Sequence, residues 1–134
     1  MTRATAPPRD MMWLEKEYRV LDAGIRFAVR VLHASGFETC QSCQGGKGHA
    51  YDQPTVEMVA TSNDALGFGA LEALYAYGLP VSAIAIVWPV QNGMPYEKNW
   101  RITFSETMES RADEKPMFIF GYRALGTPRQ RQEP

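Results

Sequence analysis

The sequence predicts an α/β fold of the α+β type, in which two α-β-β units form a four- or five-stranded sheet with the helices packed on one face. Two observations predict it. Apolar residues at helical spacing give way to strand-like alternation twice along the chain. Residues 34–37 and 76–79 also share an Ala-x-Gly pattern 42 residues apart, each at a helix end that opens a pair of strands. Two such units place both helices on the same side of one sheet.

The first unit begins with a helix predicted over residues 11–35. Asp10 is its candidate N-cap, and Gly36 is suited to the left-handed conformation that ends it. The apolar stripe of this helix is Leu14, Tyr18, Leu21, Ile25, Ala28 and Leu32. A short strand is predicted over residues 37–40, and a second over residues 55–61 after Pro54.

The second unit begins with a helix predicted over residues 63–77 and capped by Ser62, Asn63 or Asp64. Residues 81–90 form the clearest strand, and their apolar character on both faces predicts a central place in the sheet. A turn starting at Asn92 leads to a strand over residues 100–105 that is polar on one side.

Composition indicates one domain with a single core: 134 residues, 45% hydrophobic and 22% charged. We divide the chain into a disordered lead-in (1–9), the α/β domain (10–106), a polar break with a candidate edge strand (107–125) and a disordered tail (126–134). A net charge of −1 without a basic stripe argues against binding of long nucleic acid. No apolar run approaches the roughly 20 residues of a membrane span. The N-terminus has no hydrophobic signal segment, so we expect a cytoplasmic protein with free thiols.

Residues 40–49 are the candidate functional site. This Gly-rich loop holds both cysteines, Cys40 and Cys43, together with Lys47 and His49, one of two histidines. A redox role for Cys-x-x-Cys is disfavoured, because the motif leads into a loop rather than opening a helix. His33, the other histidine, lies in the last turn of the first predicted helix, where a structural role is expected.

Four interpretations of the loop stay open. The first is a cradle for a small anionic ligand such as a nucleotide, formed by backbone amides and side chains. Its residues are Ser42, Gln44, Gly45, Gly46, Lys47, His49 and, on the following strand, Glu57. The second is thiol catalysis by a hydrolase or transferase, with Cys43 as nucleophile, His49 as base and Asp52 orienting the imidazole.

The third interpretation is a zinc site at Cys40, Cys43 and His49, with Asp52 or Glu57 as fourth ligand. The fourth is a glycine-permitted turn with buried thiols and no chemistry. Residues alone do not identify a cofactor. A different class of function is an interaction protein that inhibits a host system, with residues 117–124 and the tail as its contact surface.

The segments from the first helix through Phe104 resemble a group of uncharacterised phage and prophage proteins. The resemblance is carried by Gly-Phe-Glu-Thr at 36–39, Ser-Cys-Gln-Gly-Gly at 42–46, Gly-His at 48–49 and Pro-Thr-Val at 54–56. The loop is also similar to that of the wybutosine-synthesis tRNA methyltransferases, whose Ser-Cys-x-Gly motif is matched by Ser42, Cys43 and Gly45. Gly46 stands where that family has a basic residue, and Lys47 follows one position later. The resemblance implies an α/β fold and a loop that meets a nucleotide or a cofactor.

Overall fold

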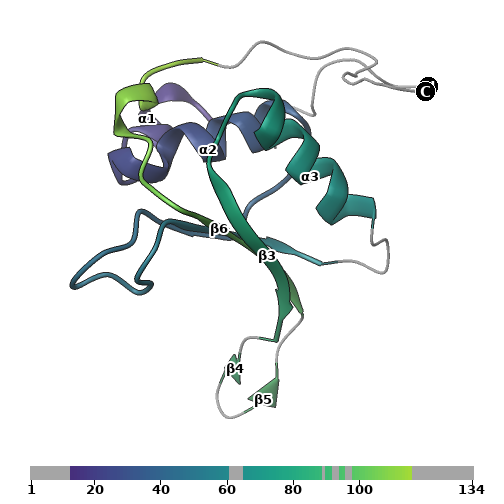
Figure 1. Ribbon diagram of the computed structural model, residues 1–134. Helices are drawn as coiled ribbons and strands as arrows, with labels where there is room; N and C mark the ends of the chain where they lie inside the picture. The colour runs from purple at the N-terminus through teal and green to yellow at the C-terminus, as the bar shows by residue number, and fades with distance from the viewer. Residues whose placement is uncertain (1–12, 61–64, 89, 92–93, 96–97, 116–134) are drawn as a thin grey trace.

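The computed structural model describes residues 13–60, 65–88, 90–91, 94–95 and 98–115. Its helices lie over one face of a four-stranded sheet (Figure 1). The described elements follow the order α-β-β, α-β-β: α2 (Ala23–Ala34), β1 (Gln41–Cys43), β2 (Thr55–Val59), then α3 (Ala65–Ala76), β3 (Val81–Val87) and β6 (Asn99–Phe104). The predicted fold class and the two repeated units are therefore confirmed, with a four-stranded described sheet.

The first helix is not continuous, contrary to the prediction over residues 11–35. A single turn, α1 (Glu15–Tyr18), is separated from α2 (Ala23–Ala34). Asp22 has ψ 135, which takes the backbone out of the helical region. The guanidinium of Arg26 donates hydrogen bonds to the carbonyls of Arg19 and Leu21, which the break leaves without helical partners. Apolar spacing continues across the break, so periodicity alone did not reveal it.

All strand pairs in the main sheet are antiparallel, in the order β1-β2-β6-β3. The first strand is Gln41–Cys43 and follows the predicted residues 37–40, because the residues that pair with β2 are Gln41, Ser42 and Cys43. The predicted central place of the strand over residues 81–90 is wrong as well. β3 pairs with β6 on one side and is the last strand of the described sheet, whereas β6 is inside it.

The face of β3 away from the helices explains that error. Ala83 and Ala85 are exposed there, and alanine is small enough to be tolerated on an open face. The polar face of β6 lies on the same side of the sheet, since Ala83 is paired with Thr103 and Ala85 with Arg101. The apolar residues on both faces of β3 therefore belong to one half-buried face, with Ile84 and Ile86, and one open face that carries the small side chains of Ala83 and Ala85.

The core lies between the two long helices and the sheet. Ile25, Val29 and Leu32 of α2 are completely buried, as is Leu74 of α3. The sheet contributes Val56, Met58, Ile102 and Phe104. Burial of each large apolar side chain contributes roughly 1.5–3 kcal/mol to the free energy of folding. Apolar packing between the helices and the sheet is therefore the main favourable term that holds the helices on the sheet.

A small second sheet, β4 (Val90–Gln91) with β5 (Met94–Pro95), extends beyond β3. No helix among the described residues is long and apolar enough to cross a membrane. Several predictions lie outside the described residues: the caps at Asp10 and at 62–64, the turn at Asn92 and the candidate edge strand at 117–124.

Candidate functional site: a cysteine, a histidine and an aspartate at the loop neck

The loop between β1 and β2 is closed at a narrow neck. Gly45 has φ +81, and a Cβ there would lie 2.3 Å from the backbone carbon of Gln53. The Gly46 amide donates to the carbonyls of Tyr51 (3.1 Å) and Asp52 (3.0 Å). Only glycine permits both the positive φ and this close crossing of two backbones. The neck fixes where the loop leaves and rejoins the sheet.

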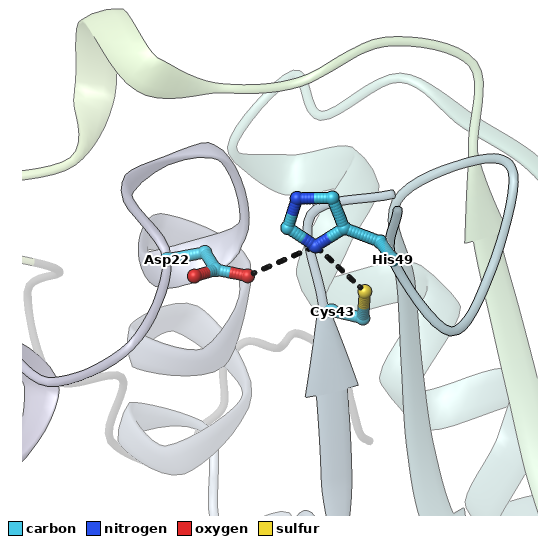
Figure 2. Close-up of side chains that lie close together, drawn as sticks. All are labelled: Asp22, Cys43 and His49. Atoms are coloured by element: carbon cyan, nitrogen blue, oxygen red, sulfur yellow. Dashed lines mark hydrogen bonds and ion pairs between the residues drawn. The ribbon is translucent and has the colours of Figure 1, made fainter. Parts of the chain in front are cut away.

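The neck brings His49 back over the end of β1. Its Nδ1 lies 3.6 Å from the Cys43 sulfur and 3.7 Å from Oδ2 of Asp22 (Figure 2). Donor atoms of the three residues all lie within 4.8 Å of one another. Cys43 is buried, whereas the side chains of His49 and Asp22 are 32% and 44% exposed, so solvent reaches the cluster from one side.

Asp22 comes from the N-terminus of α2, where it is the N-cap residue, yet its side chain makes no capping hydrogen bond. Gln44 does this instead: its Oε1 accepts a 3.0 Å hydrogen bond from the Gly24 amide. A Cβ on Gly24 would lie 2.8 Å from that oxygen, so glycine at 24 lets Gln44 approach. The Asp22 carboxylate is thereby left to face His49.

A backbone donor also reaches the sulfur. The Gly45 amide donates to Cys43 Sγ over 3.4 Å. The Gly45 amide is therefore directed toward the Cys43 sulfur.

The residues predicted to cradle an anion are not arranged around one point. The amides of Gly45 and Gly46 are used inside the loop, and Gln44 Oε1 is used at α2. Ser42 lies in β1 opposite Val56, and Lys47 is exposed on the loop. Of the predicted cradle, only His49 lies in the cluster with Cys43.

Glu57 belongs to a separate buried group on the open face of the sheet. Its carboxylate accepts hydrogen bonds from Asn99, Arg101 and Tyr51, each 2.8 Å long. Burial alone would raise the pKa of Glu57, but these three donors outweigh it and lower the pKa below its usual value. The Arg101 guanidinium also lies over the Tyr51 ring, at 5.0 Å. The group attaches the returning arm of the loop to the sheet.

Cys40 is directed elsewhere than Cys43. Its sulfur donates to the carbonyl of Glu57 over 3.5 Å. Partial desolvation and the Glu57 carboxylate raise the pKa of the Cys40 thiol, so it keeps its proton more firmly than a free cysteine. The structure thus places Asp22, and not Cys40, beside Cys43 and His49.

His33 lies in a buried polar network away from the cluster. Its ring nitrogens are hydrogen-bonded with the Tyr18 hydroxyl and with Thr39 Oγ1, both at 3.0 Å. Trp13 packs edge-on against the ring, with centroids 4.8 Å apart. Burial lowers the pKa of His33 to about 4. This arrangement holds α1 and the segment after α2 together, which is a structural role.

The functional residue that sequence reasoning missed is Asp22. It lies 21 residues before Cys43, inside what was predicted as an uninterrupted helix. One signal was present: aspartate is a preferred N-cap residue, and Asp22 stands in the middle of the predicted helix. That signal would have located the break and a carboxylate at the N-terminus of α2.

Comparisons with known proteins identify no relative of this chain. No model of a protein family, no curated protein and no solved structure matches this chain.

Proposed function

We propose that this protein binds a transition-metal ion, with Zn²⁺ the best fit, through Asp22, Cys43 and His49. The observation that carries the proposal is the position of one atom: His49 Nδ1 lies 3.6 Å from a sulfur and 3.7 Å from a carboxylate oxygen. The distance to the carboxylate is longer than that of a direct hydrogen bond, and the distance to the sulfur is that of a weak hydrogen bond involving sulfur. Both are close to the separation between neighbouring ligands around a tetrahedral ion.

The comparison can be made from bond lengths. Zinc lies about 2.3 Å from sulfur and about 2.0–2.2 Å from nitrogen or oxygen, so tetrahedral ligands lie roughly 3.3–3.6 Å apart. The two distances from Nδ1 need to change by only a few tenths of an ångström for an ion to be held. The third separation, from Cys43 to Asp22, closes by rotation of the Asp22 side chain, which is 44% exposed.

The donor types favour zinc over other common ions. A thiolate disfavours Mg²⁺ and Ca²⁺, which prefer oxygen ligands. Imidazole and carboxylate together with thiolate suit a borderline-soft ion such as Zn²⁺. The Gly45 amide is placed as a hydrogen-bond donor to the metal-binding sulfur, as outer contacts at metal sites commonly are.

Within the described part of the chain the cluster has three candidate ligands, so the fourth tetrahedral position is left for another group. Such three-ligand sites are typical of catalytic rather than structural zinc. The half-exposed Asp22 and His49 side chains give that position access to solvent. We propose that it binds an anionic group, a phosphate or carboxylate of a small nucleotide-like ligand. A ligand of this class agrees with what the similarity to the wybutosine-synthesis enzymes implies, which is a loop that meets a nucleotide or a cofactor.

The experiment is a Zn²⁺ titration of reduced, EDTA-treated full-length protein in competition with a chromophoric chelator. We expect one ion per chain, and with Co²⁺ a thiolate-to-metal charge-transfer absorption. Cys43→Ser should remove that absorption and lower the Zn²⁺ affinity at least 10–100-fold. Cys40→Ser is the matched control and should bind as the wild type does. A wild-type protein that binds no Zn²⁺ would overturn the proposal, and equal losses in both variants would reject this ligand set.

A second candidate is a thiol-dependent hydrolase or transferase. The Cys43 sulfur and His49 Nδ1 are 3.6 Å apart, and the Gly45 amide donates a hydrogen bond to the same sulfur. Against it, a catalytic triad places the carboxylate on the ring nitrogen that does not face the nucleophile. Here Asp22 and Cys43 approach the same nitrogen. Iodoacetamide distinguishes the two: a metal-bound Cys43 is protected by Zn²⁺, whereas a free nucleophile is alkylated at the same rate with or without it.

A further inference from the structure

The side chain of Arg26 spans the break between α1 and α2. Its Nη2 donates to the carbonyl of Leu21 over 3.1 Å and to that of Arg19 over 3.4 Å. Its Nη1 donates to Oδ1 of Asp113 over 3.3 Å. The Nε is buried and has no hydrogen-bond partner among the described residues, so the terminal nitrogens alone orient the guanidinium. With a side chain only 13% exposed, Arg26 is a fixed part of the break and not a solvated surface charge.

The position of Arg26 on α2 is unfavourable for a cation in isolation. It follows the N-cap residue Asp22 by four positions, near the positive end of the helix dipole. Contact with carbonyl oxygens that lack helical donors accounts for a cation there. Residues four apart on a helix are neighbours, so Asp22 would be an ordinary ion-pair partner for Arg26. Among the described residues, however, Arg26 pairs with Asp113, and Asp22 faces His49.

The backbone of Asp22 is held on both sides. The Leu21 carbonyl belongs to the planar peptide group that precedes Asp22, so the guanidinium fixes the plane from which the chain turns into α2. On the other side, the Gly24 amide donates to Gln44, and the Gly24 carbonyl accepts from the Met108 amide over 2.9 Å. The direction of the Asp22 carboxylate therefore depends on two anchored peptide groups, one before it and one after it.

We infer that Arg26 is a positioning residue for the metal site, acting through Asp22; the inference rests on the proposed function. Among the described residues, Arg26 makes no hydrogen bond or ion pair with Cys43 or His49, so it has no direct route to the ion. Its route is the Leu21 carbonyl, which fixes the entry to Asp22. Bond lengths to a metal are held to about 0.2 Å, so a small rotation of this peptide group is enough to displace the carboxylate ligand.

The test is a double-mutant cycle on Zn²⁺ affinity, measured by chelator competition with the full-length protein. Arg26→Met keeps an unbranched apolar side chain and removes every donor, and it should lower Zn²⁺ affinity roughly 10-fold. In an Asp22→Asn background it should cause no further loss, because the residue through which it acts has already been removed. Asp113→Asn is the matched control. It removes the ion pair of Arg26 and keeps both carbonyl hydrogen bonds, so the affinity should not change.

Equal losses with and without the Asp22 carboxylate would show that Arg26 acts only by general destabilisation, and would overturn the inference. Unchanged affinity in Arg26→Met would overturn it as well. Arg26→Lys restores one donor for the Leu21 carbonyl and should recover part of the affinity. If circular dichroism shows that Arg26→Met does not fold, Arg26→Lys takes its place in the cycle, with the same two outcomes.

Failure of this inference is distinguishable from failure of the proposed function. A wild type that binds Zn²⁺, and loses it in Cys43→Ser, retains the metal site whatever Arg26 does. A wild type that binds no Zn²⁺ would overturn both.

Discussion

Gln44 caps helix α2 in place of its own N-cap residue, by accepting the hydrogen bond of the Gly24 amide. Asp22 occupies the N-cap position, and an aspartate there ordinarily accepts such a bond. Because a residue from the loop does so, the Asp22 carboxylate stays directed at His49. The loop therefore contributes twice to the cluster, once by carrying His49 and once by releasing Asp22.

Gln44→Ala should both destabilise the protein and weaken metal binding. Loss of the cap should cost about 1 kcal/mol in the free energy of unfolding, measured with urea. The Asp22 carboxylate can then turn to the freed Gly24 amide, so Zn²⁺ affinity should fall roughly 10-fold, as for other losses of supporting contacts at metal sites. Gln41→Ala, at an exposed position of β1, should change neither quantity. Unchanged Zn²⁺ affinity in Gln44→Ala would show that the cap does not position Asp22.

Comparing Gly45→Ala with Gly48→Ala distinguishes the energetic cost of backbone strain from the cost of a close backbone contact. Both glycines have positive φ, +81 and +86, but a Cβ meets the Gln53 backbone only at Gly45 and open space at Gly48. Gly48→Ala should therefore cost about 1 kcal/mol, the usual penalty for a left-handed alanine. Gly45→Ala should cost about 3 kcal/mol or more, because the backbones of Gly45 and Gln53 must also move apart. Equal costs in thermal or urea unfolding would mean that the neck is not tightly closed.

Zn²⁺ should stabilise the folded chain through the cluster. Metal at a hundred times its dissociation constant adds about 2.7 kcal/mol to the free energy of unfolding, and EDTA should reverse the gain. Asp22→Asn should lose most of that gain. It should hardly affect the metal-free protein, because the Asp22 carboxylate makes no capping bond and is 44% exposed. Asp113→Asn, also exposed, serves as the control and should keep the full gain. Stabilisation of both variants alike would place the ion elsewhere.

Stability should fall in mild acid because of His33. Burial lowers the pKa of His33 to about 4 from its ordinary 6.5. Between these two pH values the unfolded chain binds a proton at His33 and the folded chain does not. The contribution of neutral His33 to the free energy of unfolding is complete above pH 6.5 and is lost as the pH falls toward 4. The loss between pH 7 and pH 5 is about 2 kcal/mol. Lowering the pH from 7 to 5 should reduce the free energy of unfolding of His33→Gln, measured with urea, by about 2 kcal/mol less than that of the wild type. Identical pH slopes in the two proteins would contradict the assignment.

Local sequence patterns were sufficient for the two long helices, for the strands that follow α3 and for the α-β-β repeat, but not for the break before α2 or the position of β1. Alternation in residues 55–59 and helical spacing in residues 23–34 reflect the apolar residues that each element packs into the core, Val56 and Met58 on β2 and Ile25, Val29 and Leu32 on α2. The glycines that end helices, and the crowding of Cys43, Lys47 and His49 in one loop, were likewise visible without coordinates. A local signal of this kind depends only on neighbours along the chain.

Tertiary structure decided the order of the strands and the membership of the site. β3 is an edge strand because β6 pairs between it and β2, and no pattern within residues 81–87 records which strand comes next. Cys43 is adjacent to Asp22 and not to Cys40, because the neck at Gly45 and the Gln44–Gly24 hydrogen bond bring the start of α2 to the end of β1. The sequence by itself determined which side chains with metal-binding or nucleophilic chemistry lie in the loop. Contacts between residues distant in the chain decided which of them meet, since convergence of side chains depends on how elements pack and not on how they are spaced.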